Sequence, residues 1–167
     1  LFLLLLLLPI NDCFSLKGLK SPRSSIILKS SATTCLPSAF EDIIPFLAEH
    51  VEKSDHLLLM GCKTDLSVQL VKAGWGTEQT GFMRVIDNNE EALKECREQA
   101  LADPEVKKWI DNGKLTFELA DFTNMPEICK QSVFDAIVDN GGLDGVLTNE
   151  GEEGMLKAID HLQNAVR

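Results

Sequence analysis

Short apolar runs alternate with amphipathic segments along most of the chain, and this alternation predicts its secondary structure. Apolar side chains recur at helical spacing over 39–54, and the run "HLLLM" at 56–60 is typical of a buried strand. Further strands are predicted at 82–87, 114–121 and 134–140, and further helices at 66–74, 88–113 (interrupted at Pro104) and 152–167. This order predicts an α/β fold, a Rossmann-like and mostly parallel sheet flanked by helices.

The first 38 residues differ in composition from the rest and predict a presequence. The apolar block "LFLLLLLLPI" is shorter than the roughly 20 residues that span a bilayer and is typical of a secretory signal. Residues 14–38 are rich in Ser and basic residues and contain no Asp or Glu, as transit peptides are. We therefore expect 1–38 to be a disordered signal-plus-transit presequence and 39–167 to be the folded domain.

Such a two-part presequence resembles those of algae with secondary plastids, so we expect the chain to reach a plastid. Secretion, or a cytoplasmic location if the upstream residues are not translated, is the alternative. Neither reading predicts a stable membrane span in the mature protein.

Charge and cysteine spacing disfavour several kinds of site. The chain has a net charge of −10, and its acidic excess lies after residue 38. We therefore expect no nucleic-acid partner, whereas a basic protein substrate would suit this charge. The five cysteines form no CxxC pair and no metal-ligand spacing, which disfavours a disulfide framework and zinc and fits a reducing compartment. The oligomeric state is left open.

Ligands of parallel α/β sheets bind beyond the carboxyl ends of the strands. The residues there suggest a site for a nucleotide-like ligand. Gly61 and Cys62 follow the first strand, where glycine lets a ligand approach the backbone and a helix N-terminus offers free N–H groups. Asp87 follows the second strand, where an acidic residue can accept hydrogen bonds from ribose hydroxyls. An ordinary strand–helix turn and a helix N-cap are the alternative interpretations.

The third and fourth strands are followed by further polar residues. The Asp121 carboxylate could accept a hydrogen bond from an adenine amino group, with Phe122 beside the ring. The alternative is that Asp121 belongs to an ordinary turn and that Phe122 packs in the core. In "DNGGLDGVL" we expect Asp139 and Asp144 to sit with Asn140 in a glycine-rich turn. Together the four strand ends suit a cofactor that contains adenosine.

Four motifs carry a resemblance to a known family. "LLLMGCKTDLSVQLVKAGW" resembles the first motif of class I S-adenosylmethionine-dependent methyltransferases, above all the methyltransferase-like 13 branch of elongation-factor lysine methyltransferases. "RVIDNN", "ADFTNMP" and "FDAIVDNGGLDGVL" follow in the family's order, and the resemblance covers about 40–167. It implies S-adenosyl-L-methionine as cofactor and a protein lysine amine as acceptor. It also implies a seven-stranded fold of which this chain would hold the first half, so we expect a C-terminal truncation.

The resemblance also implies roles for individual residues. Asp139 and Asn140 are the expected catalytic residues at the substrate entrance. The expected cofactor contacts are Gly61, Cys62 and Asp65 at the methionine moiety, Asp87 and Asn88 at the ribose, Asp121 and Phe122 at the adenine, and Asp139 and Gly141 near the sulfonium.

Some positions depart from the family pattern. Lys63 replaces the second glycine of the first motif, and an ammonium pointing at the sulfonium would weaken cofactor binding. A non-catalytic cofactor-binding relic or partner-binding module is therefore an alternative function. A nicotinamide-dependent Rossmann protein is a further alternative, disfavoured because the glycine pattern that a pyrophosphate requires is missing.

Overall fold

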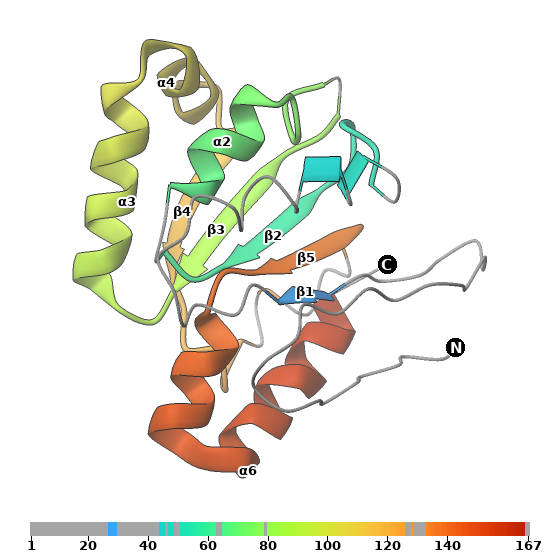
Figure 1. Cartoon of the computed structure of the whole chain (residues 1–167), viewed down its shortest axis with the longest axis vertical. Coiled ribbons are helices and arrows are strands. Elements are labelled where there is room, and N and C mark those ends of the chain that lie inside the picture. Colours follow the sequence, from blue (N-terminus) through green and yellow to red (C-terminus); the bar gives the residue numbers. More distant parts are fainter. Residues whose placement is uncertain are drawn as a thin grey trace.

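The computed structural model describes residues 27–29, 44–45, 47–48, 51–62, 65–78, 80–125, 128 and 133–165. Its elements are strands interspersed with helices, as Figure 1 shows. The strands are β1 (Ile27–Lys29), β2 (Leu57–Met60), β3 (Met83–Asp87), β4 (Leu115–Leu119) and β5 (Ala136–Asp139), and the helices are α2 (Leu66–Lys72), α3 (Glu90–Ala102), α4 (Pro104–Asp111) and α6 (Gly142–Ala165).

The strands form one sheet in the order β1-β5-β2-β3-β4, and every neighbouring pair is parallel. All four residues of the central strand β2 are buried, as are all four of β5. Strands buried on both faces read as continuous apolar runs, which is why the sequence showed them so clearly. The predicted Rossmann-like α/β fold is confirmed.

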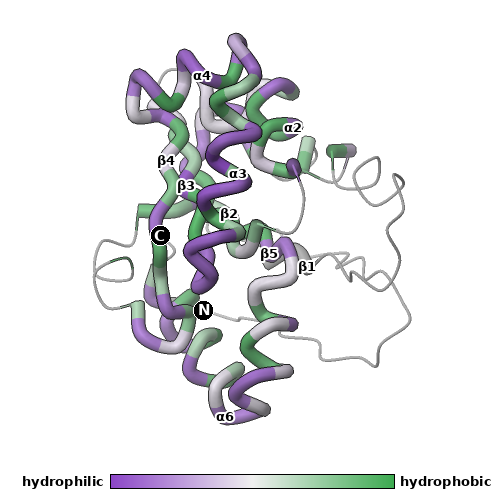
Figure 2. The backbone as a smooth tube through the Cα atoms, turned by 90° about the vertical axis from the view of Figure 1, so that its left-hand side faces the viewer, coloured by the Kyte–Doolittle hydropathy of each residue, from purple (hydrophilic) through white to green (hydrophobic). Residues whose placement is uncertain are grey.

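Helices cover both faces of the sheet (Figure 1). On one face, Leu57 and Leu59 of β2 pack with Leu70 of α2 and Val106 of α4. On the other face, Leu58 and Met60 pack in a second core that includes Phe122 and Phe134 and the buried side of α6. Figure 2 shows the apolar residues gathered along β2 and β3 and the polar ones along α3. The alternation of side chains along each strand thus divides the apolar residues between two cores.

The predicted interruption at Pro104 separates two helices. Asn89 caps α3, because its Oδ1 accepts hydrogen bonds from the N–H groups of Glu91 (3.0 Å) and Ala92 (3.2 Å). Asp103 caps α4 in the same way, with Pro104 in the first turn. The Asp103 carboxylate also forms an ion pair of 2.7 Å with Lys72 of α2, and this pairing lowers the pKa of Asp103.

The prediction of a glycine-rich turn after β5 is wrong. Helix α6 begins at Gly142, directly after the strand, so Asp144 lies in its first helical turn. The start is favourable because Oδ1 of Asp139 accepts the N–H of Leu143 at 3.1 Å, and because Leu143 and Val146 bury their side chains. The helical pattern breaks at Gly151, where φ is 69° and ψ is −164°, so the predicted helix from residue 152 is the second part of α6.

Two segments near the amino end bear on the sequence predictions. Residues 44–45 and 47–48 are helical within the helix predicted over 39–54. Ile27–Lys29 fall within the expected presequence but form β1, with Ile27 opposite Ile137 of β5. The expected disorder of the presequence and its boundary at residue 38 stay predictions. No helix within the described part of the chain is both long and apolar enough to cross a membrane.

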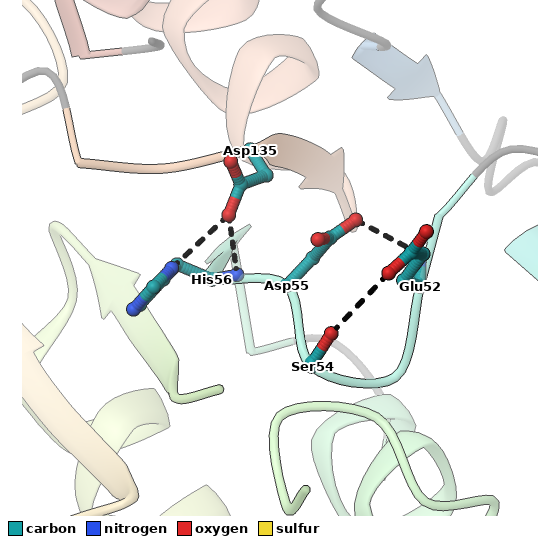
Figure 3. Close-up of polar contacts among 5 residues, drawn as sticks. All are labelled: Glu52, Ser54, Asp55, His56 and Asp135. Atoms are coloured by element: carbon teal, nitrogen blue, oxygen red, sulfur yellow. Dashed lines mark hydrogen bonds and ion pairs between the residues drawn. The ribbon is translucent and has the colours of Figure 1, made fainter. Parts of the chain in front are cut away.

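At the amino edge of the sheet, Asp135 joins the starts of β5 and β2. Its Oδ2 accepts hydrogen bonds from the backbone N–H of His56 at 2.9 Å and from the His56 ring Nδ1 at 3.0 Å (Figure 3). The His56 ring in turn meets Phe82 edge-on, with 4.4 Å between ring centroids. These contacts fix the central strands at the end opposite to the expected site.

Candidate functional site

The predicted site residues after β5, β2, β3 and β4 lie at one edge of the sheet. The strands are parallel, so their carboxyl ends all meet there. Backbone hydrogen bonds continue past the strand ends: Asn140 N–H donates to Met60 O at 2.6 Å, Gly61 N–H to Ile86 O at 2.8 Å, and Ala120 N–H to the backbone O of Asp87 at 2.9 Å. The site residues are therefore held in strand order, side by side.

Gly61 is required by the close approach of the loops after β2 and β5. Its φ is +91°, and a Cβ atom there would lie 2.7 Å from Asn140 O and 2.9 Å from Gly142 N. The Asn140 side chain adds a hydrogen bond of 3.3 Å from Nδ2 to Gly61 O. Gly61 therefore has a packing reason to be glycine, besides any contact with a ligand.

The carboxylate of Asp87 is oriented by two backbone N–H groups. Oδ2 accepts from Cys62 at 2.7 Å, and Oδ1 accepts from Asn89 at 2.8 Å. The alternative interpretation of Asp87 as a helix N-cap is wrong, because Asn89 caps α3. Asp87 is 8% exposed, and the neighbouring Asn88 is exposed. The contact to Cys62 ties the loop after β2 to the end of β3.

After β4, Asp121 makes a turn and Phe122 packs in the core. Asp121 Oδ1 accepts from the N–H of Thr123 at 2.9 Å and from its hydroxyl at 2.8 Å. Phe122 is buried, and a Cβ atom at Gly142 would lie 3.1 Å from its ring. His161 of α6 donates from Nε2 to Thr123 O at 3.1 Å. These contacts are those of the ordinary turn, and the roles expected at an adenine stay predictions.

The residues at the end of β5 and directly after it are buried. Asp139 is completely buried and Asn140 is 4% exposed, while Gly141 has a φ of +86°. Asp144, in the first turn of α6, is half-buried. Of the two carboxylates in this segment, Asp144 is thus the more exposed one, and Asp139 supports the start of α6.

At the entrance to α2, Asp65 is exposed and its Oδ2 accepts from the Gln69 side chain at 2.8 Å. It makes no side-chain cap for the helix. Lys63 and Thr64 lie outside the described residues, so the effect expected of Lys63 stays a prediction.

A contact that sequence reasoning missed lies beside Asp87. Ser67 Oγ lies 3.6 Å from Cys96 Sγ, within hydrogen-bonding reach. Interaction with Cys62 lowers the pKa of the Cys96 thiol to about 7, and the hydrogen bond with Ser67 lowers it too. Interaction with Cys96, together with burial, raises the pKa of Cys62. The helical spacing of α3 turned Cys96 inward, but only the folded chain brings it to Ser67.

Two open clefts in the described structure are lined in part by helix α2. One, of about 250 Å³, is lined by residues that include Lys72 and Trp109. The other, of about 460 Å³, runs from Asp65 to the Lys72–Asp103 ion pair. Neither contains Asp87 or Asp139, so the strand-end geometry and not these clefts defines the candidate site. Among the described residues, no group of three or more His, Cys, Asp or Glu side chains could hold a metal ion.

No protein-family model matches the chain, and no curated protein matches it. A solved structure described as the crystal structure of MccD protein is similar to it, with a TM-score of 0.52 and 22% sequence identity. The match covers 78% of this chain and 50% of that one, so the chain spans half the length of the solved protein. This likeness extends to the fold, a parallel sheet between helices.

Proposed function

We propose that this chain is the cofactor-binding part of an S-adenosylmethionine-dependent methyltransferase, similar to the methyltransferase-like 13 branch. The observation that carries the proposal is the adjacency, at one sheet edge, of Asp139–Gly141, Gly61–Cys62, Asp87 and Asp121, in strand order. These are the positions that the four sequence motifs supply. The MccD likeness supports a fold of this kind.

The residues at this edge suit an adenosyl ligand. A carboxylate offers about four acceptor positions, and the described bonds to Asp87 use one on each oxygen, which leaves acceptor capacity for ribose hydroxyls. Gly61 presents backbone without a side chain where the methionine moiety would lie. Asp65, which precedes α2, and Asp121, which follows β4, are exposed.

Bound S-adenosylmethionine would supply an electrophilic methyl group. The acceptor nitrogen forms a bond to the methyl carbon as the sulfur–carbon bond breaks, and the amine proton leaves to water. Such an in-line displacement depends on alignment and on exclusion of water. The buried Asn140 would serve alignment by holding Gly61 in place, and the half-buried Asp144 would attract the acceptor ammonium.

We propose a lysine of a basic protein as the acceptor. The net charge of −10 favours a basic partner. The exposed acidic residues Glu90 and Glu91 at the start of α3 lie close to the sheet edge in sequence and would attract it.

A non-catalytic module is the second candidate function, and the contacts of Asp87 favour it. Both oxygens of Asp87 already accept backbone hydrogen bonds, and only 8% of the residue is exposed. A carboxylate used in this way holds the fold together even without a ligand. Such a module would keep the fold and transfer no methyl group.

The test is transfer of a labelled methyl group from S-adenosylmethionine to a lysine-rich peptide. A copy of the peptide with every lysine acetylated is the control, because acetylation removes the nucleophilic amine. We expect label only on the free-lysine peptide and inhibition by S-adenosylhomocysteine. Binding of S-adenosylhomocysteine without transfer to lysine-rich or other basic acceptors would favour the non-catalytic module.

A further inference from the structure

We propose that the cleft between helices α2 and α4 binds a free aromatic amino acid, with its ring on Trp109 and its two charged groups on Glu105 and Lys108. The cleft has a volume of about 250 Å³, and neither Asp87 nor Asp139 lines it. Pockets for drug-sized ligands begin at about 300 Å³, so this cleft suits a smaller molecule. The proposal concerns a second site and does not depend on the proposed methyl transfer.

The floor of the cleft is apolar and aromatic. Val71 of α2 is 5% exposed, and Val106 of α4 is completely buried. Trp109, on the same helix as Val106, packs against the same core and is only partly buried. An indole held in this way, with apolar neighbours, offers a surface against which a second aromatic ring can pack.

Glu105 and Lys108 line the cleft with opposite charges. Residues three positions apart are neighbours on a helix surface, yet no ion pair joins these two within the described part of the chain. Lys108 Nζ lies 5.0 Å from the centroid of the Trp109 ring. A carboxylate bound to this ammonium would therefore lie close to the indole, and Glu105 would remain for an ammonium of the same ligand.

The third charged residue of the cleft, Lys72, is already paired. Its Nζ lies 2.7 Å from Oδ2 of Asp103, the residue that caps α4. One positive and one negative charge are therefore left for a ligand, at Lys108 and Glu105. A zwitterion matches this pair, whereas a dianion such as a phosphate monoester would place a like charge beside Glu105.

Thr77 adds a further polar group to the cleft. Its Oγ1 donates a hydrogen bond to Gly74 O at 2.8 Å, so the hydroxyl offers a ligand only acceptor positions. Such an oxygen suits an ammonium and not a carboxylate. The cleft thus combines an aromatic surface, one available cation and two acceptors, which are the groups that a small aromatic zwitterion requires.

The chain has two tryptophans, so the indole N–H signals in nuclear magnetic resonance report on the cleft directly. Trp109 lines the cleft, whereas Trp75 is 2% exposed and its Nε1 donates to Val51 O at 3.4 Å. The whole chain, labelled with ¹⁵N, is titrated with L-phenylalanine, and W109F assigns the two signals. We expect a saturable shift of the Trp109 signal and no shift of the Trp75 signal.

Two derivatives and three variants separate the charged contacts. L-phenylalaninamide lacks the carboxylate and N-acetyl-L-phenylalanine lacks the ammonium, so each should bind at least about tenfold more weakly. K108Q should weaken binding of L-phenylalanine by a similar factor and leave that of the amide unchanged, and E105Q should leave that of the N-acetyl derivative unchanged. K107Q is the matched control, because Lys107 pairs with Asp111 and does not line the cleft.

Several results would overturn the proposal. One is a Trp109 signal that does not shift, or that shifts without saturation, in the unaltered chain. Another is binding of both derivatives as tight as that of L-phenylalanine. An effect of K107Q as large as that of K108Q would also contradict it. The titrations of the unaltered chain need no cofactor, so their result stands even if a variant misfolds or if no methyl transfer is found.

Discussion

The carboxylate of Asp87 at the end of β3 accepts a 2.7 Å hydrogen bond from the backbone N–H of Cys62 in the loop after β2. The residue expected to hold a ribose thus also holds the loop expected to contact the methionine moiety. Binding and stability therefore depend on the same side chain.

Replacing Gly61 with Ala is expected to destabilise the chain by more than replacing Gly113 with Ala. Both glycines have a positive φ, +91° and +70°, but only at Gly61 would a Cβ meet backbone, 2.7 Å from Asn140 O. We expect a loss of about 1–2 kcal/mol in the free energy of unfolding for G113A and a clearly larger loss for G61A. Urea unfolding followed by circular dichroism measures both. Equal losses would show that the contact between the loops is not tight.

Replacing Asp135 with Ala is expected to lower the free energy of unfolding by about 1–3 kcal/mol, because it removes two part-buried hydrogen bonds to His56. The control is D55A, which removes an exposed hydrogen bond from the Glu52 N–H in the turn before β2 (Figure 3). This replacement should lower the free energy of unfolding by less. Ligand affinity should not change in D135A, since Asp135 lies at the opposite edge of the sheet. A loss of affinity in the folded variant would contradict this separation of roles.

The rate at which Cys62 and Cys96 react with a small disulfide is expected to rise as the pH passes about 7, the pKa of Cys96, rather than near the ordinary value of 9.0. The direction follows because deprotonation creates the reactive thiolate. A chain with Cys13, Cys35 and Cys129 replaced by serine isolates the pair, and an aromatic disulfide reagent reports the rate by absorbance.

The Ser67 hydroxyl provides a control for this pH profile. Its hydrogen bond also lowers the pKa of Cys96, so S67A should move the profile to higher pH. An identical profile in S67A, or a midpoint near 9 in both chains, would show that these contacts do not set the reactivity.

The sequence was sufficient for the parallel sheet but not for all of the site. Buried strands such as β2 show as apolar runs, and the Asn89 and Asp103 caps follow ordinary local chemistry. The first part of helix α6 was missed because its first residues are glycine-rich, and its start depends on Asp139 and on buried Leu143. Likewise, the contact of Ser67 with Cys96 and the bond from Cys62 to Asp87 join distant residues, which no local pattern reveals.

Calorimetric titration of the chain with S-adenosylhomocysteine, with D87N and D111N as paired variants, tests most directly whether this sheet edge binds the cofactor. Asp111 is exposed on α4 and pairs only with Lys107 among the described ion pairs, so D111N controls for the loss of one charge. We predict saturable binding by the unaltered chain and by D111N, and at least about tenfold weaker binding, or about 1.4 kcal/mol, by folded D87N. Absence of binding to the unaltered chain, or equal affinity of all three proteins, would contradict the assignment of this sheet edge to the cofactor.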